Sequence, residues 1–315
     1  MEIIVPALIF IAGFIIIIKS SDLFIDAAVW MSEVTGFSKA VIGATLVSFA
    51  TTSPEYFVSL VAVSKGNVDM SIGNAVGSLA ANLGIAFAAL AILTPGVIQD
   101  KLFGLKGLMM IGAAVMLLIF CLNGTVSIIE GIVLFSIFLL FIFFNACYSK
   151  DGGCTESERK QTNKKEIAVN VLKFVAGAAG IIFASNLIVD NAVIIATFMN
   201  ISEAVIGLTI IAIGTSLPEI VTSIAAVLKK HNAISIGNIL GANIINISLI
   251  LSTGAFVSGG NLTVSRSSMF QDIPLAILLM LMAVLPVIIR KRISRLQGCL
   301  MAGVYISYLA YLVIF

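Results

Sequence analysis

Runs of about 20 apolar residues recur along the whole chain, and each run is long enough to cross a bilayer as a helix. Hydrophobic residues make up 60% of the sequence and charged residues only 11%, whereas a soluble domain carries about 25% charged residues. The alternating apolar and polar pattern of an outer-membrane barrel is missing from the sequence. The sequence therefore predicts an all-α membrane protein with many spans.

Polar breaks divide the chain into ten predicted transmembrane helices. The first five form one predicted repeat, residues 1–147, and the last five a second repeat, residues 167–315. The polar stretch 148–166 between them predicts a flexible linker. Because the N-terminus lacks a basic region, its apolar run is interpreted as the first span and not as a cleaved signal. The predicted spans are residues 4–24, 38–64, 70–95, 104–122, 126–147, 168–194, 203–228, 233–257, 270–289 and 296–315.

A five-residue motif ending in Pro-Glu occurs twice in the sequence. The copies are Thr51-Thr52-Ser53-Pro54-Glu55 and Thr215-Ser216-Leu217-Pro218-Glu219, which are 164 residues apart. The same offset holds without a gap from Ser21, which matches Ser185, to Asn82, which matches Asn246. An odd number of spans in each repeat turns the second copy upside down in the membrane. The fold is therefore predicted to contain two inverted five-helix repeats.

The distribution of basic residues predicts the orientation of the chain. Loops that follow odd-numbered spans carry 14 of the 18 Lys and Arg residues, and loops on the opposite side carry only Lys65 and Arg266. The positive-inside rule then places both termini outside and the 148–166 linker in the cytoplasm. The predicted location is the cytoplasmic membrane of the cell.

Each copy of the motif predicts oxygen ligands for a cation. Pro54 lacks an N–H and its ring conflicts with the carbonyl of Ala50, and Pro218 does the same to Gly214, so each helix is predicted to kink or unwind there. Freed carbonyls, Thr and Ser hydroxyls and one carboxylate then form the all-oxygen ligand set that hard cations such as Ca²⁺ and Na⁺ prefer. The two motifs are therefore candidate halves of one ion-binding site.

Polar residues four positions apart extend this candidate site along two helices of each repeat. Asn side chains offer a carbonyl oxygen to a cation without adding charge, although such polar stripes also hold membrane helices together. The downstream stripes include a GxxxG pattern, which lets helices approach closely. The stripes contain Thr51, Glu55 and Ser59; Thr215, Glu219 and Ser223; Asn74, Ser78 and Asn82; and Asn238, Ala242 and Asn246.

The charge of the two glutamates narrows the class of substrate. Glu55 and Glu219, brought together at the midplane, are neutralised by one Ca²⁺, by two Na⁺ or by two protons. Two ionised and unpaired carboxylates inside a membrane are costly. The empty site is therefore predicted to resist reorientation, which is the physical requirement for exchange as opposed to uniport.

These paired motifs resemble those of the cation/Ca²⁺ exchanger superfamily, specifically its Na⁺/Ca²⁺ exchanger branch, in which two inverted repeats each carry G-T-S-x-P-E/D and a downstream G-S-x-x-x-N/D. The resemblance spans essentially all ten predicted helices, and it implies that spans one and six slide across the rest to alternate access. It also implies Glu55 and Glu219 as central Ca²⁺ ligands shared with Na⁺. The further ligands that it implies are hydroxyl and carbonyl oxygens of Thr51, Thr52, Thr215 and Ser216, carbonyls near Ser48 and Ala212, and the side chains of Ser78, Asn82 and Asn246.

The chain departs from that family pattern in three places. The first motif reads Ala50-Thr51-Thr52-Ser53 in place of Gly-Thr-Ser-hydrophobic, which keeps the hydroxyls. Ala242 stands where the family has Ser, so one flanking Na⁺ site loses a hydroxyl ligand. Asn246 stands where many prokaryotic and K⁺-dependent relatives carry Asp. This neutral residue argues against K⁺ dependence and removes a possible proton-binding carboxylate.

The leading prediction is an electrogenic, K⁺-independent antiporter that exchanges Na⁺ for Ca²⁺ by alternating access. A H⁺/Ca²⁺ exchanger that uses the same two glutamates is the alternative, and a passive cation channel is a third possibility. An intramembrane hydrolase would need a GxGD or GxSxG motif, and neither occurs in the sequence, so no enzymatic activity is predicted. The predicted partners are Na⁺, Ca²⁺ and the lipid bilayer, with no nucleic acid, obligate protein partner or cofactor.

Overall fold

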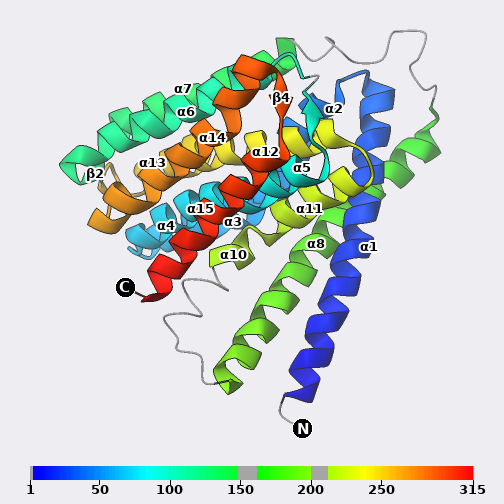
Figure 1. Ribbon diagram of the computed structural model, residues 1–315, viewed down its shortest axis with the longest axis horizontal. Coiled ribbons are helices and arrows are strands. Elements are labelled where there is room, and N and C mark those ends of the chain that lie inside the picture. The colour runs from blue at the N-terminus through cyan, green and yellow to red at the C-terminus, as the bar shows by residue number, and fades with distance from the viewer. Residues whose placement is uncertain (1–2, 99, 148–161, 200–211, 315) are drawn as a thin grey trace.

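The computed structural model describes residues 3–98, 100–147, 162–199 and 212–314, and these residues are almost entirely helical (Figure 1). Within them, nine helical segments are long and apolar enough to cross a membrane. The predicted seventh span is represented by the shorter helix Leu217–Leu228, and its predicted start at residue 203 lies outside the described residues. The predicted fold class, an all-α membrane protein of two inverted repeats, is confirmed.

The two halves repeat the same order of helices and short strands. The first half contains α1 (Ile4–Thr35), α2 (Lys39–Ile42), η1 (Gly43–Val47), α3 (Ser48–Ser64), α4 (Val68–Ala81), η2 (Asn82–Phe87), α5 (Ala88–Leu93), β1 (Gly96–Val97), α6 (Phe103–Phe120), η3 (Cys121–Asn123), β2 (Thr125–Val126) and α7 (Ile128–Cys147). The second contains α8 (Lys164–Phe198), α10 (Ala212–Thr215), α11 (Leu217–Leu228), α12 (Asn232–Ile245), η6 (Asn246–Ile250), α13 (Leu251–Val257), β3 (Leu262–Thr263), η7 (Ser268–Asp272), α14 (Ile273–Arg290), β4 (Arg292–Ile293) and α15 (Arg295–Ile314).

Two small antiparallel strand pairs join the halves. β1 pairs with β4, and β2 pairs with β3. In each pair, the turn after the third span of one half meets the turn between the last two spans of the other half. The label of β2 lies at one end of the helices and that of β4 near the other end (Figure 1). This arrangement is what an inverted repeat produces, because the same contact is made twice on opposite faces.

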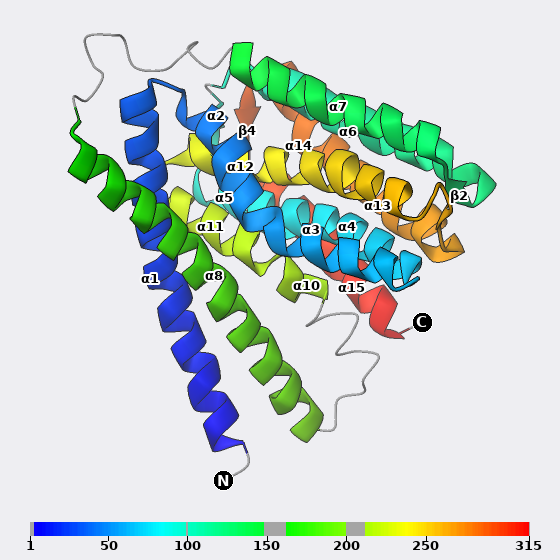
Figure 2. The same cartoon turned by 180° about the vertical axis from the view of Figure 1, so that it is seen from behind.

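The long helices α1 and α8 lie side by side in both views and extend beyond the other helices (Figures 1 and 2). They also cross symmetrically: a Cβ on Gly13 would lie 2.7 Å from Ile188 Cγ1, and a Cβ on Gly177 would lie 2.8 Å from Phe24 Cβ. Gly13 and Phe24 match Gly177 and Ile188 at the repeat offset. Close approach at both glycines therefore makes α1 and α8 one tightly packed pair.

The predicted boundaries of these two helices were too short. α1 continues from the predicted end at residue 24 to Thr35, and α8 begins at Lys164, inside the predicted linker. The Asn163 side chain accepts a hydrogen bond from Glu166 N at 2.8 Å, which caps the start of α8. At about 1.5 Å per residue, both helices exceed the hydrocarbon thickness of about 30 Å, so their ends leave the apolar layer. Apolar residues alone therefore did not mark these ends.

The centre of the molecule is formed by the third and eighth spans. In the most apolar 18-residue stretch of each span, 94% of the residues are buried in Asn232–Val257 and 72% in Val68–Leu93. The corresponding shares are 22% in Ile4–Thr35 and 17% in Lys164–Phe198. Exposed apolar side chains on the outer helices are those expected to meet lipid tails. The predicted motifs on α3 and α11 pack against this central pair.

Candidate cation-binding site

The two Pro-Glu motifs adopt different backbone structures. In the first copy, α3 continues through Pro54 without a break, and the π-helical turn η1 precedes it. In the second copy, the helix is interrupted at Ser216, and Pro218 lies in the first turn of α11, where a missing N–H costs nothing. The predicted interruption is thus present in the second copy, whereas in the first copy the helix continues through the proline.

Glu55 and Glu219 are both buried at the contact between α3 and α11. Each residue is 1% exposed, and Glu219 faces Glu55, Thr51 and Thr52. None of the four carboxylate oxygens has a well-formed hydrogen-bond partner among the described residues, and neither does Thr52 Oγ1. Buried carboxylates without partners are expensive. The pair is therefore a strong candidate for binding positive charge.

Matching asparagines hold the two glutamate-bearing helices in place. Asn74 Nδ2 donates to the Glu55 carbonyl at 3.3 Å and to Ser59 Oγ at 3.0 Å. In the second half, Asn238 Nδ2 donates to the Glu219 carbonyl at 3.4 Å and to Ser223 Oγ at 3.0 Å. The predicted stripes are therefore partly structural: Asn74 and Asn238 bind protein atoms and fix the backbone beside each glutamate.

Thr51 connects the two halves directly. Its hydroxyl lies 3.3 Å from the Ser48 carbonyl and 3.3 Å from Asn238 Oδ1. The same Asn238 holds the Glu219 backbone, so a predicted ligand of the first repeat is positioned by the second repeat. The two motifs form one connected site.

The downstream predicted ligands lie on the central helices. Ser78 Oγ, Asn82 Oδ1 and both polar side-chain atoms of Asn246 are buried and lack a hydrogen-bond partner in the described structure. Asn82 and Asn246 each begin a π-helical turn, η2 and η6. Such turns often occur at functional sites because they alter the local hydrogen-bond ladder. These oxygens are available to a cation.

The remaining predicted residues lie around the break in the second copy and at the start of α3. Ser216 is buried and its hydroxyl has no partner in the described structure, and Thr215 ends α10 just before it. Ser48 is buried, with its carbonyl facing Thr51. Ala212 begins α10, which packs against α4.

Asn243 was missed by the sequence analysis. Its Oδ1 accepts a hydrogen bond from Asn82 Nδ2 at 3.1 Å, and its Nδ2 lies 3.6 Å from Met110 Sδ. The repeat offset maps Asn243 to Leu79, so the repeat itself gave no signal for it. Asn82 in the first half is therefore hydrogen-bonded to the second half. The matching Asn246 has no hydrogen-bond partner in the described structure for either side-chain polar atom.

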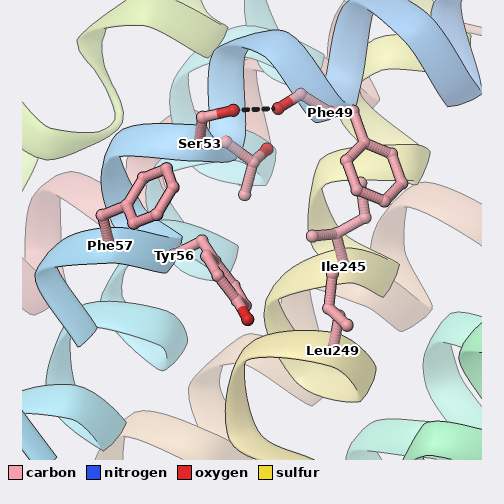
Figure 3. Close-up of a pocket in the computed structure, with 7 residues that line it drawn as sticks. Phe49, Ser53, Tyr56, Phe57, Ile245 and Leu249 are labelled. Atoms are coloured by element: carbon pink, nitrogen blue, oxygen red, sulfur yellow. Dashed lines mark hydrogen bonds between the residues drawn. The ribbon is translucent and has the colours of Figure 1, made fainter. Parts of the chain in front are cut away.

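A cavity of about 330 Å³ approaches the site between α3 and the eighth span (Figure 3). Apart from Thr52, Ser53 and the Tyr56 hydroxyl, its lining is apolar, with Phe49, Phe57, Ile245 and Leu249. Ser53 Oγ donates to the Phe49 carbonyl at 2.6 Å. Because Phe57 is 61% exposed, the cavity opens toward the lipid-facing surface and is a poor route for a hydrated ion.

The inverted repeats, the helix interrupted at Ser216 near the centre and the unpartnered carboxylates together define an ion transporter. The sequence matches the family described as sodium/calcium exchanger protein over residues 5–146 and 169–314. The chain belongs to this family, and it is therefore a multi-pass membrane transporter and not an enzyme.

Individual relatives agree with this assignment. The chain is 28% identical to the sodium/calcium exchanger MaX1 of Methanosarcina acetivorans, in an alignment that covers 97% of both proteins. It is 34% identical to the inner membrane protein YrbG of Escherichia coli over 259 residues, which covers 80% of both proteins. A structure of the sodium-calcium exchanger NCX_Mj superimposes with a TM-score of 0.82, at 29% identity and with 98% of each chain covered.

Proposed function

We propose that the protein exchanges Na⁺ for Ca²⁺ across the cytoplasmic membrane by alternating access, and that this exchange is electrogenic and independent of K⁺. The observation that carries the proposal is the pair of buried carboxylates, Glu55 and Glu219, which face each other without well-formed hydrogen bonds. One Ca²⁺ neutralises both charges, and Na⁺ ions replace it in the return step. An empty site leaves the charges uncompensated in a low-dielectric interior, which disfavours uncoupled movement.

The proposed ligands keep the roles assigned from the sequence. Glu55 and Glu219 bind Ca²⁺ and share it with Na⁺. Oxygens of Thr51, Thr52, Thr215 and Ser216 complete the centre. Flanking Na⁺ sites use the carbonyls near Ser48 and Ala212 and the side chains of Ser78, Asn82 and Asn246. The unpartnered oxygens among these residues support the assignment.

The proposed domain organisation and membrane orientation follow from the two inverted repeats. Residues 1–147 and 167–315 form the two repeats, and the 148–166 linker lies in the cytoplasm with both termini outside. The excess of Lys and Arg in loops on the linker's side supports this orientation.

Proteoliposomes loaded with Na⁺ test the function. We expect rapid ⁴⁵Ca²⁺ uptake when external Na⁺ is removed. The uptake rate should be the same whether K⁺ or choline replaces the external Na⁺, which tests K⁺ independence. The rate should change with an imposed membrane potential, which tests electrogenic exchange. Liposomes without protein are the control. Equal uptake driven by a pH gradient without Na⁺ would instead support H⁺/Ca²⁺ exchange, and ion leak without a countertransported ion would support a channel.

Ala242→Ser is expected to strengthen one Na⁺ site. Ala242 is fully buried on α12 and matches Ser78 at the repeat offset, so the substitution restores a hydroxyl to the half that lacks it. One added ligand is worth about 1 kcal/mol, or roughly a fivefold lower half-saturating Na⁺ concentration. Ser78→Ala is the matched variant and should raise that concentration. If the Na⁺ dependence of uptake were unchanged in both variants, neither position would contribute to Na⁺ binding.

A further inference from the structure

Lys229 connects the α1–α8 pair to the central helices at one end of the molecule. Its Nζ lies 2.7 Å from Asp26 Oδ1 and 3.2 Å from Asp22 Oδ1, and it donates to the Asp22 carbonyl at 2.9 Å. Lys229 directly follows α11, the helix that carries Glu219. We call this group of contacts the Lys229 latch.

Other charged groups at this end contact different partners. Lys39 Nζ lies 3.4 Å from His231 Nδ1. Burial, followed by the charge of Lys39, lowers the pKa of His231, which favours the neutral ring beside the Lys39 ammonium. Among the residues that the structure describes, Lys229 is the cation that bridges this end of α11 to the carboxylates of α1.

The internal repeat contains the same lysine and aspartate a second time. At the 164-residue offset, Lys229 matches Lys65 and Asp26 matches Asp190. Lys65 follows α3, the helix that carries Glu55, and Asp190 lies on α8. The second pair therefore has the same place in its repeat as the Lys229 latch, but the inversion puts it at the opposite face of the membrane.

The second pair is not formed in this structure. Lys65 and Asp190 are both exposed, and no ion pair joins them in the described part of the chain. The surrounding helices show the same asymmetry, because α1 packs extensively against α11 while α8 touches α3 only sparsely. Among the described residues, the α1–α8 pair is therefore joined to the central helices more extensively at the Lys229 end than at the Lys65 end.

We propose that Lys65 and Asp190 form a second latch in the opposite-facing state, and that transport alternates between the two latches. The proposal rests on the exchange function proposed above. When the α1–α8 pair slides, the inverted symmetry exchanges the environments of the two ends. Asp190 then takes the position beside Lys65 that Asp26 has beside Lys229 here, and the Lys229 latch opens. Each ion pair closes one face of the membrane, and the two do not form together.

The two latches are unequal, which predicts a bias between the states. Asp22 supplies both a carboxylate and a carbonyl to Lys229, but its repeat mate is the neutral Asn186. Exposed ion pairs are individually weak, so the extra carboxylate shifts the populations modestly, by roughly twofold to fivefold. The state seen here, with the Lys229 latch closed, is the favoured one.

Cysteine cross-linking tests the second latch without relying on transport. Lys65→Cys with Asp190→Cys is the test pair, and Lys229→Cys with Asp26→Cys is the matched control pair. A short bifunctional thiol reagent is needed, because a lysine–carboxylate contact spans more than a direct disulfide allows. Cys147, Cys154 and Cys299 are first replaced by Ser, and the product is read from its electrophoretic mobility in membranes, with and without Na⁺ and Ca²⁺.

We expect the test pair to cross-link, with a yield that rises under the ionic conditions in which the control pair's yield falls. The cross-linked test pair should also lose transport and regain it when the reagent is cleaved. Efficient cross-linking of the control pair with no product from the test pair under any ionic condition would overturn the proposal. A cross-linking result of this kind stands even if Na⁺/Ca²⁺ exchange itself fails in proteoliposomes, so the two proposals are tested separately.

Discussion

Glu55→Gln and Glu219→Gln are each expected to reduce Na⁺-driven Ca²⁺ uptake by at least about 100-fold. Each substitution keeps the size of the side chain and removes one negative charge from a site where both carboxylates are 1% exposed. A divalent cation then retains an uncompensated charge in the membrane interior. Breaking a buried charge pair costs about 3–5 kcal/mol, which corresponds to roughly 100-fold to 4,000-fold.

Thermal unfolding separates loss of binding from loss of folding in these variants. Without Ca²⁺, the variants should be as stable as the parent protein or more stable, because the repulsion between the two glutamates is removed. Ca²⁺ should raise the thermal unfolding midpoint of the parent protein but not that of either variant, because only the parent binds the ion tightly.

Glu130→Gln is the matched control for the loss of charge. Glu130 Oε2 accepts hydrogen bonds from Ser127 N at 2.7 Å and Ser127 Oγ at 2.9 Å at the start of α7, away from the candidate site. Its substitution should leave uptake close to that of the parent. If either glutamate variant of the site exchanged ions at the parent rate, that glutamate would not be an ion ligand.

The centre of the candidate site could be predicted from the sequence because the Pro-Glu motif occurs twice at one offset. A single Pro-Glu pair in an apolar helix is ambiguous, but two copies at one offset imply two matched positions in an inverted fold. In the structure, Glu219 faces Glu55, Thr51 and Thr52. The ligand roles themselves remain predictions, and the experiments above address them.

Contacts that break the repeat could not be predicted in this way. Asn243 binds Asn82 across the halves, but its repeat mate is Leu79, so no internal comparison singles it out. The two prolines lie in similar motifs, yet α3 continues through Pro54 whereas the second copy is interrupted at Ser216. The Asn82–Asn243 contact depends on tertiary packing between the halves, which an internal comparison of the sequence does not reveal.

Gly241→Ala is expected to disrupt both stability and transport. A Cβ at this position would lie 2.6 Å from the Ala44 carbonyl and 2.6 Å from Ser48 Oγ. One turn earlier, a Cβ at Gly237 would collide with the Ala40 carbonyl. The obstructing atoms are largely backbone, so the new methyl group can be accommodated only if the eighth span moves away from the second. Overpacking of this kind costs about 1–3 kcal/mol.

The consequence of Gly241→Ala for transport follows from what that close contact positions. Asn238, on the same helix, bonds to Thr51 and holds the Glu219 backbone, so separating the helices moves ligands from both halves. We expect a lower thermal midpoint and at least about a tenfold loss of uptake, because displacements near 1 Å are costly at a preorganised site. Gly112→Ala is the control, since a Cβ there meets no atom within 4 Å and alanine favours a helix. Equal stability and uptake in the two variants would show that the eighth span does not need this close approach to form the site.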